Sequence, residues 1–224
     1  MKDLVIFDCD GVLVDSEIIT NDVAVEFFNK AGFSISTEDA LHRFLGKSDA
    51  RMCAEMEAEM GKSLPADFLK QLHEATLQAL SQNLKMIEGV KDVLGSFTCK
   101  KCVASSSVPE KILNSLNQVG LISFFFQDSI FSATMVKRSK PAPDLFLFSA
   151  ERMNVEPSKC VVIEDSLSGV QAAVAAGMDV IGFTGGSHLK NWPEHREKLR
   201  QAGALSICTH MRDLAQYLAP FGVL

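Results

Sequence analysis

Two acids stand near the start of the chain, in the segment Asp8-Cys9-Asp10-Gly11 that follows the apolar run 4–7. Side chains two positions apart at the end of a strand point to the same face, and Gly11 allows the chain to turn sharply after them. Two adjacent carboxylates can divide one reaction, with one as nucleophile and the other as acid and base. A pair of surface or capping acids is the alternative, but the apolar run before them and the glycine after them favour a reaction site.

Three further segments carry polar groups suited to phosphate, namely Ser105-Ser106, Lys140 and Glu164-Asp165. Hydroxyl and N–H groups at a helix start can hold phosphate oxygens, which makes Ser105 and Ser106 candidates for phosphate binding. The ammonium of Lys140 could bind phosphate and also orient a carboxylate. Taken singly, the serines could be helix caps and the lysine a solvated loop side chain. Taken with the acids, they supply the positioning and charge neutralisation that phosphoryl transfer needs.

The acid pair Glu164-Asp165 closes another apolar run and indicates a metal site. Acids at two neighbouring strand ends can share a hard cation, so the candidate ligands of Mg²⁺ are Asp8, Asp10, Glu164 and Asp165. Such a cation would offset the repulsion between a carboxylate nucleophile and an anionic phosphate. Asp165 could instead, or in addition, cap a helix at 167–176, and Glu164 could support the ligands from behind.

Short apolar runs bounded by turns predict the strands that position these groups. They lie at residues 4–7, 102–104, 129–131, 160–163 and 180–183, with a weaker sixth at 205–208. Helical segments separate most of them, which indicates βαβ units with right-handed crossovers. We therefore expect an α/β fold with a doubly wound parallel sheet, in which ligands gather at the carboxyl ends of the strands.

More than ninety residues separate the first predicted strand from the second, far too many for one crossover helix. Start and stop signals divide most of this interval into helices. The helices are expected at 17–31, at 37–46 after a cap by Thr37, at 49–60 between Ser48 and Gly61, and at 65–82 with Pro65 in the first turn. We interpret residues 16–83 as a helical cap domain and residues 1–15 and 84–224 as the α/β core domain.

Composition disfavours several classes of protein. The chain has 224 residues, 47% of them hydrophobic and 22% charged, with a net charge of −6 and no long basic run, so nucleic-acid binding is not expected. No apolar stretch reaches membrane-spanning length, and the start is too short and too acidic for a signal peptide, so we expect a cytoplasmic protein with no membrane partner. The one Cys-x-x-Cys, at 99–102, lacks the second pair that a zinc site needs, so its thiols are expected to be reduced.

The ordered set of polar motifs resembles that of the haloacid dehalogenase-like (HAD) superfamily of phosphohydrolases. The motifs are Asp8-Cys9-Asp10-Gly11-Val12, Ser105, Lys140-Pro141 and Glu164-Asp165-Ser166. The long helical insertion after the first motif is similar to that superfamily's small helical cap, and the likeness covers essentially the whole chain. It is strongest with β-phosphoglucomutase-like proteins and sugar-phosphate phosphatases of the 6-phosphogluconate type. The resemblance implies a Rossmann-like core with an inserted cap.

The same resemblance implies a role for each motif residue. Asp8 would attack phosphorus and become an aspartyl-phosphate, while Asp10 would protonate the leaving oxygen and then deprotonate the attacking water. Mg²⁺ would be held by Asp8, the backbone carbonyl of Asp10 and Asp165, with Glu164 supporting them. The phosphate would be held by Ser105 and Lys140.

Departures from the family pattern indicate which activity to expect. Dehalogenases of the superfamily lack an acid at the position of Asp10. The mutases carry a His five residues after the position of Asp15 and an Arg three residues after that of Gly46, where this chain has Thr20 and Asp49. We therefore expect a Mg²⁺-dependent phosphatase acting on a small sugar or sugar-acid phosphate. A phosphosugar mutase and a non-catalytic metabolite-binding protein of the same fold are the alternatives.

Substrate specificity in this family lies largely on the cap. The candidates here are Lys47, Ser48 and Arg51, near the loop at Gly46. A positive group at this loop could recognise a second anionic part or a polyol part of the substrate. A solvated helix charge is the alternative for Arg51, and Lys47 is the preferred candidate. The expected partner is a small phosphorylated metabolite, and a monomer is expected because the cap must open to admit it.

Overall fold

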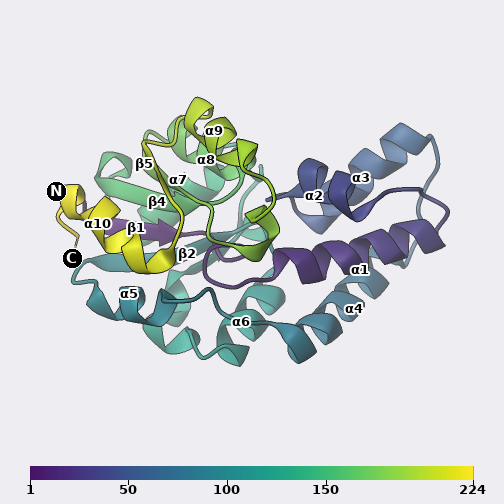
Figure 1. The fold of residues 1–224 in the computed structure, drawn as a ribbon, viewed down its shortest axis with the longest axis horizontal. Helices are drawn as coiled ribbons and strands as arrows, with labels where there is room; N and C mark the ends of the chain where they lie inside the picture. Colours follow the sequence, from purple (N-terminus) through teal and green to yellow (C-terminus); the bar gives the residue numbers. More distant parts are fainter. Residues whose placement is uncertain (224) are drawn as a thin grey trace.

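Residues 1–223 are described by a computed structural model, which places a sheet with helices on both faces beside a separate group of helices (Figure 1). The sheet has six strands in the order β3-β2-β1-β4-β5-β6, and all neighbours run parallel. The strands are β1 (Leu4–Phe7), β2 (Lys100–Ser105), β3 (Ile130–Ser132), β4 (Cys160–Glu164), β5 (Asp179–Phe183) and β6 (Ser206–Cys208). The predicted α/β fold with a doubly wound parallel sheet is confirmed.

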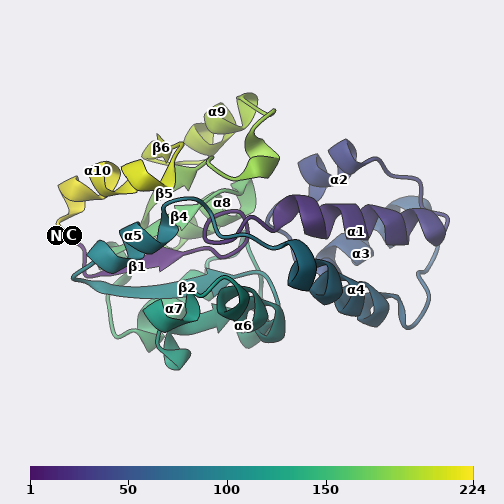
Figure 2. The ribbon, with the colours of Figure 1, turned by 60° about the horizontal axis from the view of Figure 1, so that its bottom comes forward.

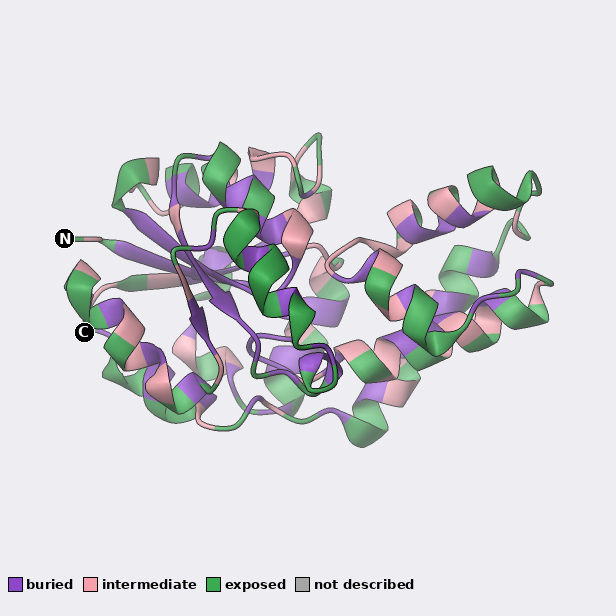
Figure 3. Ribbon diagram, turned by 45° about the horizontal axis from the view of Figure 1, so that its top comes forward, coloured by how far each residue is buried: buried purple, intermediate pink, exposed green. Residues whose placement is uncertain are grey.

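Helices cover both faces of the sheet, which explains why its central strands are apolar without alternation. In β1 all four residues are buried, Val5 and Phe7 in one apolar cluster and Leu4 and Ile6 in another. The first cluster includes residues of α5 (Val90–Ser96), α6 (Pro109–Gln118) and α10 (Leu214–Leu218), and the second includes residues of α7 (Asp144–Arg152), α8 (Leu167–Ala175) and α9 (Glu194–Gln201). Figure 3 shows the strands buried along most of their length between partly exposed helices.

The order of the strands reverses between β1 and β4, because the chain runs outward to β2 and β3 before it crosses to the other side. The two strands pair in parallel, with Phe7 opposite Ile163, and the backbone N–H of Asp8 donates to the Ile163 carbonyl at 3.0 Å. Ligands of open α/β sheets bind in the crevice at such a reversal. The acids that follow β1 and close β4 therefore lie at the expected binding edge.

Four helices fill the long interval between β1 and β2 and pack against one another. They are α1 (Glu17–Lys30), α2 (Thr37–Phe44), α3 (Asp49–Met60) and α4 (Phe68–Asn83), followed by α5. The predicted start at Ser48 and stop at Gly61 are confirmed for α3. Its N-cap Ser48 accepts a hydrogen bond from the Arg51 N–H, and its C-cap Gly61 has a left-handed backbone. The cap of α2 is Ser36 rather than Thr37, which is already helical, and α4 begins three residues after Pro65.

Two connections join these helices to the sheet, and they run side by side (Figure 2). The Asp15 N–H donates to the Lys85 carbonyl at 2.9 Å, and the Ile87 N–H donates to the Leu13 carbonyl at 3.0 Å. The helices also have an apolar cluster of their own, which includes Phe28, Met56 and Leu72. On this packing we propose a cap domain at 16–83 and a core domain at 1–15 and 84–224, whose last residue, Leu224, lies outside the described residues.

Within residues 1–223, no helix combines the length and apolar character needed to cross a membrane. Cysteines 99 and 102 are free thiols, as the sequence predicted, and neither is paired in a disulfide.

A substitution at the centre of the sheet should separate core packing from surface exposure. Leu4 is fully buried in β1, whereas Leu205 is 62% exposed before β6. We expect Leu4→Ala to lower the free energy of unfolding by about 2–5 kcal/mol, through lost apolar burial and the cavity left behind. The matched control Leu205→Ala should change it by less than about 0.5 kcal/mol. Urea denaturation measures both, and equal effects would contradict the difference in burial between the two leucines.

Candidate active site

Asp8, Asp10 and Asp165 are brought together by a tight turn after β1. The turn contains Gly11, whose φ of 75° lies in the left-handed region that side chains rarely adopt. A Cβ on Gly11 would lie 1.8 Å from Asp165 Oδ2. The glycine therefore serves two purposes, because it permits the turn and lets the backbone approach the acid that follows β4.

Lys140 crosslinks the ends of three strands. Its side chain comes from the loop between β3 and α7 and is 1% exposed. The ammonium donates to Asp8 Oδ1 at 2.7 Å, to Glu164 Oε1 at 2.6 Å and to the Ala104 carbonyl at 3.0 Å. Removing one partner of such a buried pair typically costs about 3–5 kcal/mol, because the other charge is left uncompensated.

Glu164 supports the site rather than facing open space. Its Oε1 accepts from Lys140, and its Oε2 accepts from the Ser166 N–H at 2.8 Å and the Ser166 hydroxyl at 2.9 Å. A Cβ on Gly169 would lie 1.8 Å from Oε1, so α8 approaches the carboxylate closely. The N-cap of α8 is Ser166, whose oxygen accepts from the Gly169 N–H, so Asp165 is not the cap.

Asp165 has a free buried oxygen and two histidine neighbours that the sequence analysis did not assign. Its Oδ2 is buried without a hydrogen bond, although His188 Nε2 lies 3.0 Å away in an orientation that does not donate to it. His195 Nε2 donates to the backbone carbonyl of Asp165 at 2.6 Å. Burial lowers the pKa of both histidines. No spacing rule joins these histidines to Asp165, because only the fold brings the loop after β5, with His188, and the start of α9, with His195, beside it.

The acids at this edge outnumber the cations that face them. Burial raises the pKa of Asp8 well above its ordinary value; Lys140 lowers it, and Glu164 and Asp165 raise it. Burial and Glu164 likewise raise the pKa of Asp165. When all four are ionised, the carboxylates of Asp8, Asp10, Glu164 and Asp165 meet only two ammonium groups, those of Lys111 and Lys140, so two negative charges remain without a cation. Hard oxygen donors, a free buried carboxylate oxygen and excess negative charge suit a divalent cation.

Asp10 is held by partners of its own. Lys111 Nζ lies 3.1 Å from its Oδ1, the Ser107 hydroxyl donates to its Oδ2 at 2.7 Å, and the Ser16 hydroxyl donates to its Oδ1. Burial by itself would raise the pKa of Asp10, but Lys111 and the two hydroxyls together lower it. Sequence reasoning missed Lys111 and Ser107. Ser107 lies just before α6, four residues ahead of Lys111, and the Lys111 ammonium donates to its hydroxyl at 3.1 Å.

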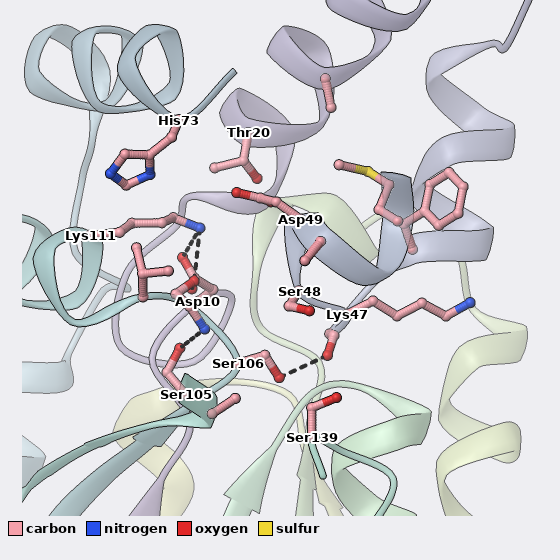
Figure 4. A pocket seen from close by; sticks show the side chains of 18 of the residues that line it. Asp10, Thr20, Lys47, Ser48, Asp49, His73, Ser105, Ser106, Lys111 and Ser139 are labelled. Atoms are coloured by element: carbon pink, nitrogen blue, oxygen red, sulfur yellow. Dashed lines mark hydrogen bonds and ion pairs between the residues drawn. The ribbon is translucent and has the colours of Figure 1, made fainter. Parts of the chain in front are cut away.

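The site opens into a cavity of about 910 Å³ between the sheet and the four inserted helices. Asp8, Asp10 and Ser105 line it from the sheet, and Ser105 Oγ accepts from the Ser107 N–H at 3.1 Å (Figure 4). Ser106 also lines it, but its hydroxyl donates to the Gly46 carbonyl at 3.0 Å. The loop at Gly46 therefore contacts the core directly at the edge of the cavity.

The three cap candidates have other partners. Lys47 Nζ pairs with Glu55 at 2.6 Å, and in Figure 4 its side chain points away from Asp10. Arg51 Nε pairs with the same Glu55 at 3.0 Å, and its Nη1 donates to the Lys140 carbonyl. Ser48 lines the cavity and caps α3. Substrate recognition by Lys47, Ser48 and Arg51 stays a prediction, and the structure gives the two cations acidic partners.

Comparison with known proteins places this architecture in a family. The haloacid dehalogenase-like hydrolase family matches residues 5–183, which contain the acids, serines and lysines of the site just described. This chain belongs to that family. The expectation of a HAD-like hydrolase is therefore confirmed.

Several relatives of this HAD-like hydrolase have been named for phosphatase activity. The 6-phosphogluconate phosphatase of Escherichia coli K12 is 32% identical over 187 residues, which cover 83% of this chain and 84% of the relative. A phosphorylated carbohydrates phosphatase of Thermotoga maritima is 35% identical over 184 residues, 79% of this chain and 82% of the relative. A crystal structure of a conserved HAD-like protein of unknown function from Agrobacterium tumefaciens C58 matches with a TM-score of 0.84 and 39% identity, over 99% of this chain and 100% of that one.

Replacing Lys111 should change the titration of Asp10. In Lys111→Met the burial of Asp10 persists while the opposing ammonium is lost, so we expect the pKa of the Asp10 carboxyl to rise. Lys111→Arg keeps the positive charge and should leave the pKa closer to that of the unaltered protein. Carbon-13 NMR titration of the carboxyl groups measures the change. An unaltered Asp10 pKa in Lys111→Met would contradict the assigned cause.

Proposed function

We propose that this HAD-like hydrolase is a Mg²⁺-dependent phosphatase that releases phosphate from a small sugar or sugar-acid phosphate through an aspartyl-phosphate on Asp8. The observation that carries the proposal is the acid pair that lines the cavity, with Asp8 fixed by the Lys140 ammonium and Asp10 fixed by Lys111. The two relatives named as carbohydrate phosphatases support this substrate class.

In the first step a carboxylate oxygen of Asp8 attacks phosphorus, and the bond from phosphorus to the sugar oxygen breaks. Asp10 donates its proton to the leaving oxygen, so the sugar departs as a neutral alcohol. In the second step water attacks the aspartyl-phosphate, Asp10 takes the proton, and phosphate leaves with Asp8 regenerated. An incoming phosphate places negative charge near Asp10 and favours the protonated acid that the first step needs.

Two side chains would position the phosphoryl group. All three N–H donors of Lys140 are used, by Asp8, Glu164 and the Ala104 carbonyl. Its first role is therefore to orient Asp8 for attack. The Ser105 oxygen accepts from the Ser107 N–H, which leaves the Ser105 proton for an acceptor such as a phosphate oxygen. Ser106 is a further donor if its bond to Gly46 is released when the cap opens.

Mg²⁺ would be held by Asp8, Asp165 and the backbone carbonyl of Asp10, with Glu164 held back by Lys140 and Ser166 as their support. Among residues 1–223, no three His, Cys, Asp or Glu side chains form a metal cluster on their own. The carbonyl and oxygens from water or phosphate would complete the coordination, as is usual for Mg²⁺. When bound, the cation would neutralise charge on the phosphate and favour the ionised form of Asp8.

The deciding experiment is phosphate release from a panel of sugar, sugar-acid and polyol phosphates, with Mg²⁺ and with EDTA. We expect release from a few related compounds, lost in EDTA and restored by added Mg²⁺. Isomerised sugar phosphate without net release would indicate the mutase instead, and binding without turnover would indicate a non-catalytic protein.

Asp8→Asn should abolish turnover without disturbing the fold. The amide keeps the shape of the side chain but cannot form the aspartyl-phosphate, so we expect kcat to fall about 10³-fold or more. Circular dichroism should match that of the unaltered protein. The control Asp22→Asn changes an exposed acid on α1 and should keep full activity. If Asp8→Asn kept the turnover of the unaltered protein, the aspartyl-phosphate mechanism on Asp8 would be contradicted.

A further inference from the structure

The charges around the cavity are unevenly compensated. The basic side chains that line it each have an acidic partner: Lys47 with Glu55, Lys70 with Glu74, His73 with Glu110, and Lys111 with Asp10. Two acids that line it, Glu17 and Asp49, form no ion pair within residues 1–223. Burial raises the pKa of Glu17 to about 8, so the carboxylate that matters here is that of Asp49, and no basic side chain of the lining is left without an acidic partner.

Of these two acids, Asp49 is the one that faces the cavity from the cap helices. It is the first residue of α3 and enters the cavity from the cap side, whereas Asp8 and Asp10 enter from the sheet. Figure 4 shows its carboxylate turned inward, toward Thr20 and the end of Lys111. Asp49 is also among the charges that raise the pKa of Lys111, which places its carboxylate within electrostatic reach of that ammonium. A sugar bound with its phosphate at Asp8 would extend toward this carboxylate.

We propose that Asp49 selects substrates whose sugar part is neutral and hydroxyl-rich, and disfavours those that carry a second anionic group. The proposal rests on the proposed phosphatase function and narrows its substrate class. A carboxylate accepts two hydrogen bonds from neighbouring sugar hydroxyls, and bonds to a charged acceptor are strong. A substrate carboxylate or second phosphate would instead face the like charge of the partly buried Asp49, which water screens less than a charge on the open surface.

Asp49 could instead serve only to stabilise α3, and the test has to distinguish this role from substrate selection. An acid in the first turn of a helix interacts favourably with the helix dipole, whatever the substrate. Asp39 offers a matched control, because it lies in the first turn of α2 on the same cap but is exposed and does not line the cavity. Asp39→Asn removes a helix-terminal charge without touching the cavity.

The test compares sorbitol 6-phosphate with 6-phosphogluconate, two linear six-carbon phosphates that differ at C1, where one has a hydroxyl and the other a carboxylate. We expect the unaltered protein to favour sorbitol 6-phosphate in kcat/KM by about tenfold or more, the scale of a single charged contact. Asp49→Asn should bring the ratio toward one, mainly by improving the acid substrate, and Asp49→Lys should reverse it. Asp39→Asn should leave the ratio unchanged.

A binding measurement keeps the proposal separate from the phosphatase function. Calorimetry with Asp8→Asn and with the double variant Asp8→Asn, Asp49→Asn gives the affinity ratio of the two compounds without turnover. Failure to release phosphate from any compound would overturn the proposed function, while the affinity ratio would still decide the role of Asp49. A preference for 6-phosphogluconate, or a ratio that Asp49→Asn leaves unchanged, would overturn the proposal. The E. coli relative is named for that sugar acid, so we expect the two proteins to differ in this preference.

Discussion

The buried ammonium of Lys140 is the interaction on which the site depends. It joins Asp8 after β1, Glu164 at the end of β4 and the Ala104 carbonyl of β2, so one side chain fixes three strand ends against one another. A charge with 1% exposure is tolerated only because all three of its donors are used. The same arrangement that stabilises the lysine aims the Asp8 carboxylate at the cavity.

Close backbone approaches make this concentration of acids possible. Gly11 and Gly169 lie where any Cβ would overlap a carboxylate oxygen of Asp165 or Glu164. Gly46 does the same on the cap, where a Cβ would lie 2.3 Å from the Ser166 hydroxyl. The cap loop is thus seated directly on the start of α8, and the helix that orients Glu164 also receives the cap. The loop at Gly46 and the acid cluster therefore share Ser166 as a common contact.

The cap contributes shape and charge rather than reacting groups. Its own apolar cluster allows it to pack as a unit, while two hydrogen-bonded connections attach it to the core. Lys47 and Arg51 share Glu55, so the most obvious cations on the cap are neutralised before a substrate arrives. The charge that faces the cavity from α3 is instead the acid Asp49. On our proposal, substrate choice depends on which cap charges are paired, and the amino-acid composition does not show which side chains pair.

The sequence alone determined the sheet, its helical insertion and the acids at the edge of the sheet. Apolar runs, glycines and prolines act on the local backbone, and the carboxyl ends of parallel strands meet at one edge wherever such a sheet forms. These local signals suffice to place Asp8, Asp10, Ser105, Lys140 and Glu164-Asp165 at one edge of that sheet. Only the tertiary structure decided the partners: Lys111 on Asp10, His188 and His195 beside Asp165, and Glu55 on the cap cations. Pairing between side chains depends on distances across the fold, which spacing along the chain does not encode.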